Sequence, residues 1–439
     1  MVEDFVNRSL ELSELTALAE RGGLVAVYGR RRVGKSRLLT RWLETCGGQY
    51  AQAIEGSPQM QMEQLRRDLR EGASAEGPEL TPRTWVEFFE LLRLEGPRAV
   101  CIDEFPYLVL ADPSLPSVVQ RFVDHRMPKG MTLILAGSSM RMMHDTFLNR
   151  SAPLFGRAAK LLPVRPMSYL SFAEAVGDAP TARTTFEKFS LVGGVPKYWE
   201  FVRPRASAVE LSERLFFGFA PYFGEEPARL LKDEGIQGQN PLSVLEAVGR
   251  GAAKPSEIAA RLGTAQSNLT RIFEALVDAS LLTKEIPFGE SSRTTKRVLY
   301  RIADPALRFH FHVYSPHRTR WAHYDAEEKA RLVATHVGPV FEAWYRAAHP
   351  GSGRYWEGER EFDVVRLETS RGKTRPIVSE LKWGEITKAE RARLEERTAL
   401  AWAASAPGKK YGPCEVEIVD STLLKDAPRM KRLCAAQEG

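Results

Sequence analysis

The sequence predicts an α/β protein of several domains, and three observations support that prediction. A glycine-rich loop at 29–36 separates an apolar, strand-like run from a segment with helical periodicity. A second apolar run ends in the acidic pair Asp103-Glu104. Near the C-terminus, three strand-like runs between 352 and 382 precede another helical segment. Strands that alternate with helices are typical of sheets covered by helices, so we expect α/β folds at both ends of the chain.

Length and composition bound the possible classes of protein. The 439 residues exceed one ordinary core, so we expect roughly two to four domains. The chain is 27% charged and 43% hydrophobic and has neither an 18-residue apolar run nor an N-terminal signal core, which predicts a cytoplasmic protein without membrane contact. Four cysteines without CxxC spacing argue against a disulfide framework or a zinc site. The net charge of +6 permits a nucleic-acid partner.

The segment GRRRVGKS (29–36) fits a phosphate-binding loop in its required strand–loop–helix context. The glycines allow backbone N–H groups to curl around phosphates. Lys35 supplies a positive charge at the β- and γ-phosphates, and Ser36 offers its hydroxyl to Mg²⁺. We therefore expect ATP and Mg²⁺ as cofactors. The predicted nucleotide-binding residues of this segment are Gly29, Arg32, Gly34, Lys35, Ser36 and Arg37.

The acidic pair after the strand-like run RAVCI predicts hydrolysis as well as binding. Asp103 is expected to hold the Mg²⁺, directly or through water. Glu104 is expected to orient and polarise the attacking water. A carboxylate next to the metal ligand is what ATP hydrolysis needs, so we predict an ATPase.

Two further residues are candidates for contact with the γ-phosphate. Ser138 ends the strand-like run MTLILAGSS; in nucleotidases with an added central strand, a polar residue at this tip touches the γ-phosphate or the water. A helix cap is the alternative role for this serine. Arg157 is a candidate γ-phosphate sensor, acting in cis or on a neighbouring subunit, although its spacing suits a surface arginine equally well. Action in trans would imply a homo-oligomer.

Six motifs stand in the order seen in the archaeal-type ATPases of the AAA+/STAND branch of P-loop proteins. They are FVNR (5–8), GRRRVGKS (29–36), CIDEFPYL (101–108), AGSSMRMM (136–143), PLFGR (153–157) and GGVPKY (193–198). The chain resembles that family over about its first 200 residues. The resemblance implies an ASCE-type parallel sheet with a helical lid. It also implies that segment 5–8 lies near the adenine and that Gly194 and Pro196 form a lid turn beside the nucleotide.

The middle of the chain predicts a helical lid and then a winged helix-turn-helix. Residues 168–235 are helical in pattern, and 239–305 read as three amphipathic helices followed by two strand-like runs. Such a unit either contacts DNA or serves as a rigid adaptor, and the sequence favours neither. The predicted nucleic-acid contacts are Gln266, Asn268 and Arg271 on the recognition helix and Arg293, Lys296 and Arg297 on the wing.

The last third carries a second possible catalytic set. Asp363 and Glu380 fall on strand-like runs, Lys382 shares a strand face with Glu380, and Glu342 lies on the preceding helical segment. Phosphodiester hydrolysis needs carboxylates that hold Mg²⁺ or Mn²⁺ and a cation near the nucleophile or phosphate. A solvated set of ion pairs is the alternative. The pattern resembles the PD-(D/E)xK nuclease fold, which implies a restriction-endonuclease-like domain.

The sequence therefore predicts a P-loop ATPase core at 1–167, a helical lid at 168–238, a winged helix at 239–305 and a nuclease-like domain at 306–439. We expect metal-dependent cleavage of DNA under ATP control, and such architectures are known in genome defence and mobile elements. Two alternatives remain: a nucleotide-switched regulator whose last domain is a binding module, and a nuclease that acts on RNA. In the nuclease interpretation Glu342, Asp363 and Glu380 bind metal, and Lys382 is catalytic.

Overall fold

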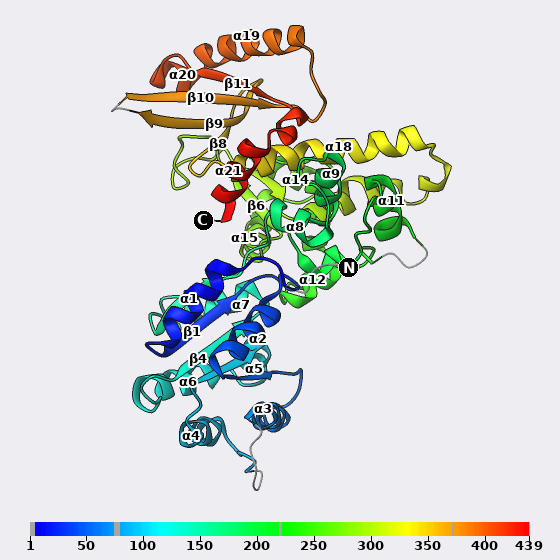
Figure 1. Ribbon diagram of the computed structural model, residues 1–439. Coiled ribbons are helices and arrows are strands. Elements are labelled where there is room, and N and C mark those ends of the chain that lie inside the picture. The colour runs from blue at the N-terminus through cyan, green and yellow to red at the C-terminus, as the bar shows by residue number, and fades with distance from the viewer. Residues whose placement is uncertain (1–4, 74–79, 219–221, 371–372, 439) are drawn as a thin grey trace.

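A five-stranded parallel sheet forms the centre of the N-terminal part (Figure 1). The computed structural model describes residues 5–73, 80–218, 222–370 and 373–438. The strands run in the order β2 (Gln49–Gln52), β3 (Ala99–Asp103), β4 (Thr132–Gly137), β1 (Gly23–Tyr28) and β5 (Ala158–Pro163). β4 is thus inserted between β3 and β1, as an added central strand requires. Because all pairs are parallel, the strand ends that carry the predicted nucleotide residues share one edge.

Helices cover both faces of this sheet, and the alternation of side chains along the strands explains why. On β1, Leu24 and Ala26 join one buried cluster, while Val25 and Val27 join the cluster on the opposite face. A strand buried on both faces reads as a continuous apolar run. The helices of this part are α1 (Ser9–Ala19), α2 (Lys35–Cys46), α3 (Pro58–Ala73), α4 (Trp85–Glu95), α5 (Phe105–Ala111), α6 (Leu115–His125) and α7 (Met140–Phe147).

The middle of the chain is mainly helical and lies between the two sheets in Figure 1. Its first group is α8 (Tyr169–Val176), α9 (Arg183–Val192), α10 (Pro196–Trp199), α11 (Ala208–Ser212), the π-helical turn Glu213–Phe217 and α12 (Glu226–Asp233). Its second group is α13 (Asn240–Gly249), α14 (Pro255–Arg261), the 3₁₀ turn Gln266–Leu269, α15 (Thr270–Asp278) and the antiparallel pair β6 (Leu282–Glu285) and β7 (Leu299–Ile302). The second group has its own buried cluster.

A four-stranded sheet dominates the C-terminal part. Its order is β11 (Glu415–Val419), β10 (Lys373–Leu381), β9 (Arg360–Ser370) and β8 (Gly353–Glu357); β10 and β11 are parallel and the other pairs antiparallel. The helices are α16 (Pro305–Phe309), α17 (Ser315–His317), α18 (Ala326–Ala347), α19 (Lys388–Ala404), α20 (Ala406–Tyr411) and α21 (Ala427–Glu438). Short turns of other helical types lie at His310–Tyr314, Trp321–His323 and Ser421–Lys425.

The largest hydrophobic cluster joins segments that the predicted boundaries separate. Phe186 of α9 packs against Phe341 and Trp344 of α18 and against Trp383, with ring centroids 5.3–5.5 Å apart. The region predicted as a lid and the C-terminal region therefore share one core. Sequence patterns within each segment do not reveal such packing, because it depends on which helices meet. No helix among the described residues has the length and hydropathy to cross a bilayer.

Candidate functional site

The loop between β1 and α2 curls around its own lysine. Arg32 and Gly34 adopt positive φ values of 70° and 93°, which turn the backbone into a tight concave loop. Lys35 is buried, and its Nζ donates hydrogen bonds to the carbonyl oxygens of Gly29 at 2.8 Å and Arg30 at 3.1 Å. Burial lowers the pKa of Lys35, and Glu104 and Asp103 oppose that shift. The ammonium group therefore lies inside the loop, near both carboxylates of the acidic pair.

The two predicted Mg²⁺ ligands lie together at the end of the sheet. Ser36 donates a hydrogen bond to Oδ2 of Asp103 at 2.6 Å. Tyr50, from the neighbouring strand β2, donates to the same oxygen at 2.7 Å, and burial and Asp103 raise the pKa of this phenol. Tyr50 carries no sequence signal for this contact, because only the pairing of β2 with β3 brings it to Asp103.

Glu104 and Ser138 meet across the same edge. The Ser138 hydroxyl donates to Glu104 Oε2 at 2.7 Å, and the Ser138 amide donates to that oxygen at 3.3 Å. Glu104 has a φ of 55°, a left-handed conformation that costs energy in a residue other than glycine. The two residues are 34 positions apart, and the parallel pairing of β3 with β4 brings them together.

Two arginines of the loop pair with distant carboxylates. Arg30 pairs with Asp304, at the start of α16, at 2.9 Å, and both side chains are buried. Burial opposes and Asp304 favours the charged form of Arg30, whose pKa is raised. Arg31 pairs with Asp233, at the end of α12, at 2.5 Å, and 42% of the Arg31 side chain is exposed. The loop is thus tied to two helices that follow the ATPase core in sequence.

The predicted binding residues Arg32 and Pro196 also lie at this junction. Arg32 donates to Glu226 on α12, and its guanidinium lies 5.2 Å from the Tyr222 ring centroid. A Cβ built on Gly34 would lie 4.0 Å from Pro196 Cγ, so the turn at 193–196 flanks the phosphate loop. The Arg32 side chain is therefore engaged by α12 in this structure.

The segment 5–8 borders the same loop. Asn7 and Arg8 have left-handed φ values of 57° and 70°. Arg8 donates to the carbonyl oxygens of Val33 at 2.9 Å and Arg165 at 2.8 Å. This bridge fixes segment 5–8 against the phosphate loop, and its predicted position near the adenine stays a prediction.

The structure corrects the cis role predicted for Arg157. This arginine immediately precedes β5, whose first residue pairs with Leu24 of β1, whereas the phosphate loop follows the other end of β1. Arg157 pairs with Asp124 on α6 at 3.0 Å. The length of β1, six residues or roughly 20 Å, separates Arg157 from the loop, so the guanidinium cannot reach a phosphate bound by its own chain. This distance within one chain does not test a role of Arg157 on a neighbouring subunit, which stays a prediction.

Five of the six predicted nucleic-acid residues lie at the surface. Gln266, Asn268, Arg271, Arg293 and Lys296 are exposed. Gln266 and Lys296 line the same groove, of about 490 Å³, between α15 and the β6–β7 pair. α15 itself contacts α7 of the ATPase core.

Arg297 differs from the other wing residues because its side chain is engaged within the protein. It forms an ion pair with Glu290 and donates a hydrogen bond to the carbonyl oxygen of Trp356 at 2.8 Å. Its guanidinium lies 5.7 Å from the Tyr355 ring centroid. These contacts join the connector between β6 and β7 to the C-terminal sheet.

Three carboxylates converge in the C-terminal part. Glu342 comes from α18, Asp363 from β9 and Glu380 from β10. Asp363 Oδ2 accepts a hydrogen bond from the Leu381 amide at 2.9 Å. Burial, the larger cause, and the charge of Asp363, the second cause, raise the pKa of Glu342 and of Glu380 to about 7. Lys382 opposes this shift at both carboxylates. The four predicted residues therefore share one electrostatic environment, with Lys382 on its exposed side.

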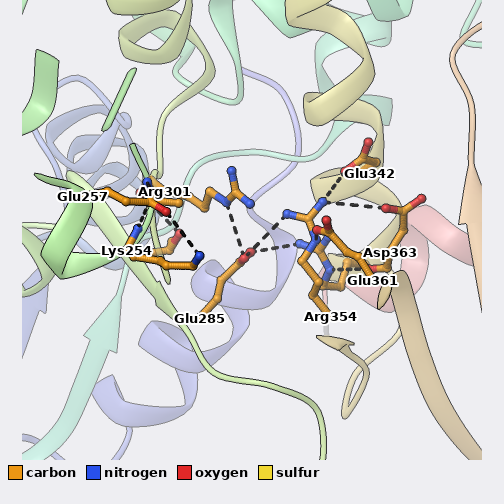
Figure 2. A network of polar contacts seen from close by, with 11 residues as sticks. Lys254, Glu257, Glu285, Arg301, Glu342, Arg354, Glu361 and Asp363 are labelled. Atoms are coloured by element: carbon orange, nitrogen blue, oxygen red, sulfur yellow. Dashed lines mark hydrogen bonds and ion pairs between the residues drawn. The ribbon is translucent and has the colours of Figure 1, made fainter. Parts of the chain in front are cut away.

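Arg354 of β8, which no sequence pattern singles out, lies beside Glu342 and Asp363 (Figure 2). Its guanidinium lies 3.0 Å from Glu342 and 3.7 Å from Asp363, and Nε lies 2.9 Å from Glu361. On its other side it approaches Glu285 of β6 at 4.0 Å. Within the described residues, no three side chains of His, Cys, Asp or Glu are gathered as a ready metal site. The cation in contact with Glu342 and Asp363 is this arginine.

Trp383, next to Lys382, has a structural role. It is buried against Phe186 and Phe341 in the shared core, and the Arg183 guanidinium lies 4.8 Å from its ring. Trp383 follows Lys382 directly. The burial of Trp383 therefore anchors the end of β10, next to the exposed Lys382.

Comparison with known proteins agrees with the geometry of the first site. Residues 5–202 match a family described as an ATPase domain predominantly from Archaea, which supports ATP binding and ATPase function. An uncharacterized protein of Methanocaldococcus jannaschii is 27% identical over 402 residues, which cover 87% of this chain and 88% of that protein. A Walker-type ATPase of Pyrococcus abyssi has a TM-score of 0.55 at 20% identity, over 71% of this chain and 97% of that one. The latter similarity concerns the fold, an α/β domain with a parallel sheet.

Proposed function

Since residues 5–202 are an archaeal-type ATPase domain, we propose that this chain hydrolyses ATP and uses that reaction to control cleavage of DNA at its C-terminal carboxylates. One observation carries the proposal of cleavage. Glu342, Asp363 and Glu380 come from three different elements, yet the charge of Asp363 raises the pKa of Glu342, and the charges of Asp363 and Glu342 both raise the pKa of Glu380. Burying like charges together is costly unless a cation is used there.

The proposed ATPase chemistry uses Asp103 and Glu104, whose carboxylates accept hydrogen bonds from hydroxyl groups. Mg²⁺ at Ser36 and Asp103 would neutralise charge on the phosphates. Lys35 would contact the β- and γ-phosphates from inside the loop. Glu104, held by Ser138 at 2.7 Å, would accept a hydrogen bond from the attacking water and orient it. Tyr50 would keep Asp103 oriented through their hydrogen bond.

The proposed nuclease chemistry needs a rearrangement at Arg354. The donor set of three carboxylates and one lysine has the chemistry that Mg²⁺ or Mn²⁺ and a scissile phosphate require. When bound, the metal would polarise the phosphate and lower the pKa of a water. Arg354 contacts two of the proposed ligands, so its guanidinium must withdraw before Glu342 and Asp363 can bind a metal together. Lys382, exposed at the edge of the set, would contact the phosphate or the nucleophile.

The proposed connection to ATP runs through the middle of the chain, which we interpret as a winged helix. Arg30 of the phosphate loop pairs with Asp304, three residues after Arg301 of β7. Arg301 lies 3.7 Å from Glu285, which in turn faces Arg354 (Figure 2). A change in the loop on binding ATP would therefore reach the strand pair that holds Arg354.

A nucleotide-switched regulator is the second candidate function. The engagement of α15 by α7 and of Arg297 by Trp356 favours an adaptor role for this region. In that case, Arg354 would be a permanent counter-ion and the last region a binding module. The two functions differ in whether the C-terminal carboxylates react.

A cleavage assay separates these candidates. The full chain would be incubated with supercoiled DNA, linear DNA, single strands and RNA, with Mg²⁺ or Mn²⁺, with and without ATP. We expect the full chain to cleave DNA. Asp363→Ala and Lys382→Ala should abolish cleavage while ATP turnover stays normal. In Lys35→Ala, cleavage should no longer respond to ATP. Glu368→Gln, an exposed carboxylate on the same strand as Asp363, serves as the control. No cleavage under any condition would support the regulator, and cleavage of RNA alone would correct the substrate.

A further inference from the structure

A cleft beside the phosphate loop contains an arginine that none of the roles above uses. The cleft has a volume of about 1340 Å³ and opens between α5, α7 and α12. Its lining includes Arg31, Tyr107, Arg141, Arg229, Asp233 and Glu234. The lining includes both positive and negative groups, and Arg31 is contributed by the phosphate loop itself.

Arg31 shares its cleft with α5, the helix that follows Glu104. Tyr107 follows Glu104 by three residues on α5 and lines the same cleft as Arg31. Burial raises the pKa of the Tyr107 phenol, Glu104 adds to that shift, and Arg31 opposes it. Arg31 and Tyr107, which follows Glu104 closely on α5, therefore line the same cleft beside the phosphate loop.

The three loop arginines differ in how firmly they are held. The side chains of Arg30 and its partner Asp304 are 6% and 3% exposed, and Arg32 pairs with Glu226, which is 1% exposed. Arg31 is 42% exposed and its partner Asp233 is 16% exposed. Removing a partner from a buried pair is costly, whereas an exposed pair contributes little to stability. Arg31 is therefore the loop arginine that can exchange its partner.

We propose that Arg31 is a catalytic residue of the ATPase, whose guanidinium leaves Asp233 and contacts the γ-phosphate when ATP binds. A phosphate with two negative charges is a stronger partner than one carboxylate for a guanidinium. Arg31 would stabilise the charge on the transferred phosphoryl group from within its own chain, the task that Arg157 is too distant to perform in cis. Asp233 would hold Arg31 aside until the nucleotide arrives.

The reaction itself is balanced without a proton on Arg31. The oxygen of water forms a bond to the γ-phosphorus, and the bond from that phosphorus to the β,γ-bridging oxygen breaks. The electron pair of the broken bond leaves with ADP, and the proton of the water passes by way of Glu104 to the released phosphate. Arg31 remains charged throughout and neutralises negative charge on the γ-oxygens.

Opposite effects of two variants test the proposal. ATP turnover by the full chain with Mg²⁺ would be measured for Arg31→Ala, Arg31→Lys and Asp233→Asn. We expect Arg31→Ala to lower kcat by about 10³-fold, the lower end of what an arginine contributes to phosphoryl transfer, with KM changed by less than about threefold. Arg31→Lys should recover part of that loss. Asp233→Asn should leave kcat unchanged or raise it, because it frees Arg31.

A purely structural Arg31–Asp233 contact predicts a different result. Both Arg31→Ala and Asp233→Asn would then lower kcat alike, together with the melting temperature, and that outcome would overturn the proposal. An unchanged kcat in Arg31→Ala would overturn it as well. Arg229→Ala is the matched control, since Arg229 lines the same cleft, is 45% exposed and lies 3.9 Å from Glu226. Its kcat should equal that of the unmodified protein, and thermal melting of each variant verifies that it is folded.

Discussion

The two acidic sites of this protein hold their carboxylates in different ways. At the end of the parallel sheet, Asp103 accepts hydrogen bonds from the neutral hydroxyls of Ser36 and Tyr50, and Glu104 from that of Ser138. In the C-terminal part, Glu342 and Asp363 lie against the guanidinium of Arg354. Neutral donors leave the charge of a carboxylate available to a cation, whereas a guanidinium already neutralises it.

This difference teaches how much each site must change before it can react. We expect the first site to bind metal and nucleotide without such a change, because a hydroxyl can keep its place beside a carboxylate that binds Mg²⁺. The second requires that Arg354 move, and its partner Glu285 on β6 offers an alternative contact for that arginine. We therefore expect ATP turnover to proceed by itself and nuclease activity to depend on a change around β6.

The largest expected effect concerns Glu104. Glu104→Gln keeps the size of the side chain and removes its negative charge, so ATP should still bind but the water should lose its base. We expect kcat for ATP to fall by about 10²–10⁴-fold, the usual contribution of a general base. Phosphate release measures turnover, and binding of a fluorescent ATP analogue measures affinity. A normal kcat would show that the first site does not use its acidic pair as described.

The next effect is a pH-dependent change in stability at Glu380. Because the folded-state pKa is about 7, against an ordinary value of 4.5, the folded protein binds this proton more tightly than the unfolded chain does. The free energy of unfolding should then decrease as pH rises from 4.5 through 7. Glu380→Gln removes this dependence of stability on pH. In the absence of metal, the free energy of unfolding of the variant, relative to that of the unmodified protein, should therefore increase by about 2 kcal/mol between pH 5 and pH 8.

Chemical denaturation at the two pH values, in the presence of a chelator, measures this difference. Glu396→Gln is the control, since Glu396 is an exposed carboxylate on α19. If the stability of both variants changes equally between the two pH values, or if that of Glu380→Gln does not change, the carboxylates of the C-terminal part are not crowded. The contrast with the first site would then fail.

A smaller effect is expected at Arg354. If its guanidinium competes with metal for Glu342 and Asp363, Arg354→Gln should tighten Mn²⁺ binding by about tenfold, an energy of about 1.4 kcal/mol. Calorimetric titration of the full chain measures the affinity, and Arg375→Gln, an exposed arginine on β10, serves as the control. Weaker Mn²⁺ binding in Arg354→Gln would mean that the arginine orients the carboxylates instead of competing for them.

The last effect, similar in size to that at Arg354, is expected at Tyr50. Tyr50→Phe removes one neutral hydrogen bond to Asp103 and leaves the Ser36 contact in place. A hydrogen bond to a charged group contributes about 1.5–3 kcal/mol, and with one of two donors remaining we expect only the lower end, roughly a tenfold rise in the Mg²⁺ concentration needed for half-maximal turnover. Turnover against Mg²⁺ concentration measures it. A loss as large as that of Glu104→Gln would mean that Tyr50 takes part in the chemistry.

Local patterns predicted much of the fold. The apolar runs at 24–28, 99–102 and 132–137 became strands of one parallel sheet, and the glycine-rich loop lies between β1 and α2 as expected. Such runs are informative because a strand buried on both faces must be apolar throughout. The convergence of Ser36 with Asp103 follows the same logic, since parallel strands place their carboxyl ends at one edge.

What the sequence determined by itself is the chemistry available at each site: a lysine and serine in a phosphate loop, an acidic pair after a strand, and three carboxylates with a lysine near the C-terminus. Only the tertiary structure decided which charges face one another. It separated Arg157 from the phosphates, tied the loop arginines to α12 and α16, and placed Arg354 among the C-terminal carboxylates. The physical reason is that ion pairs form between residues up to 274 positions apart, and the type and local spacing of residues carry no record of that proximity.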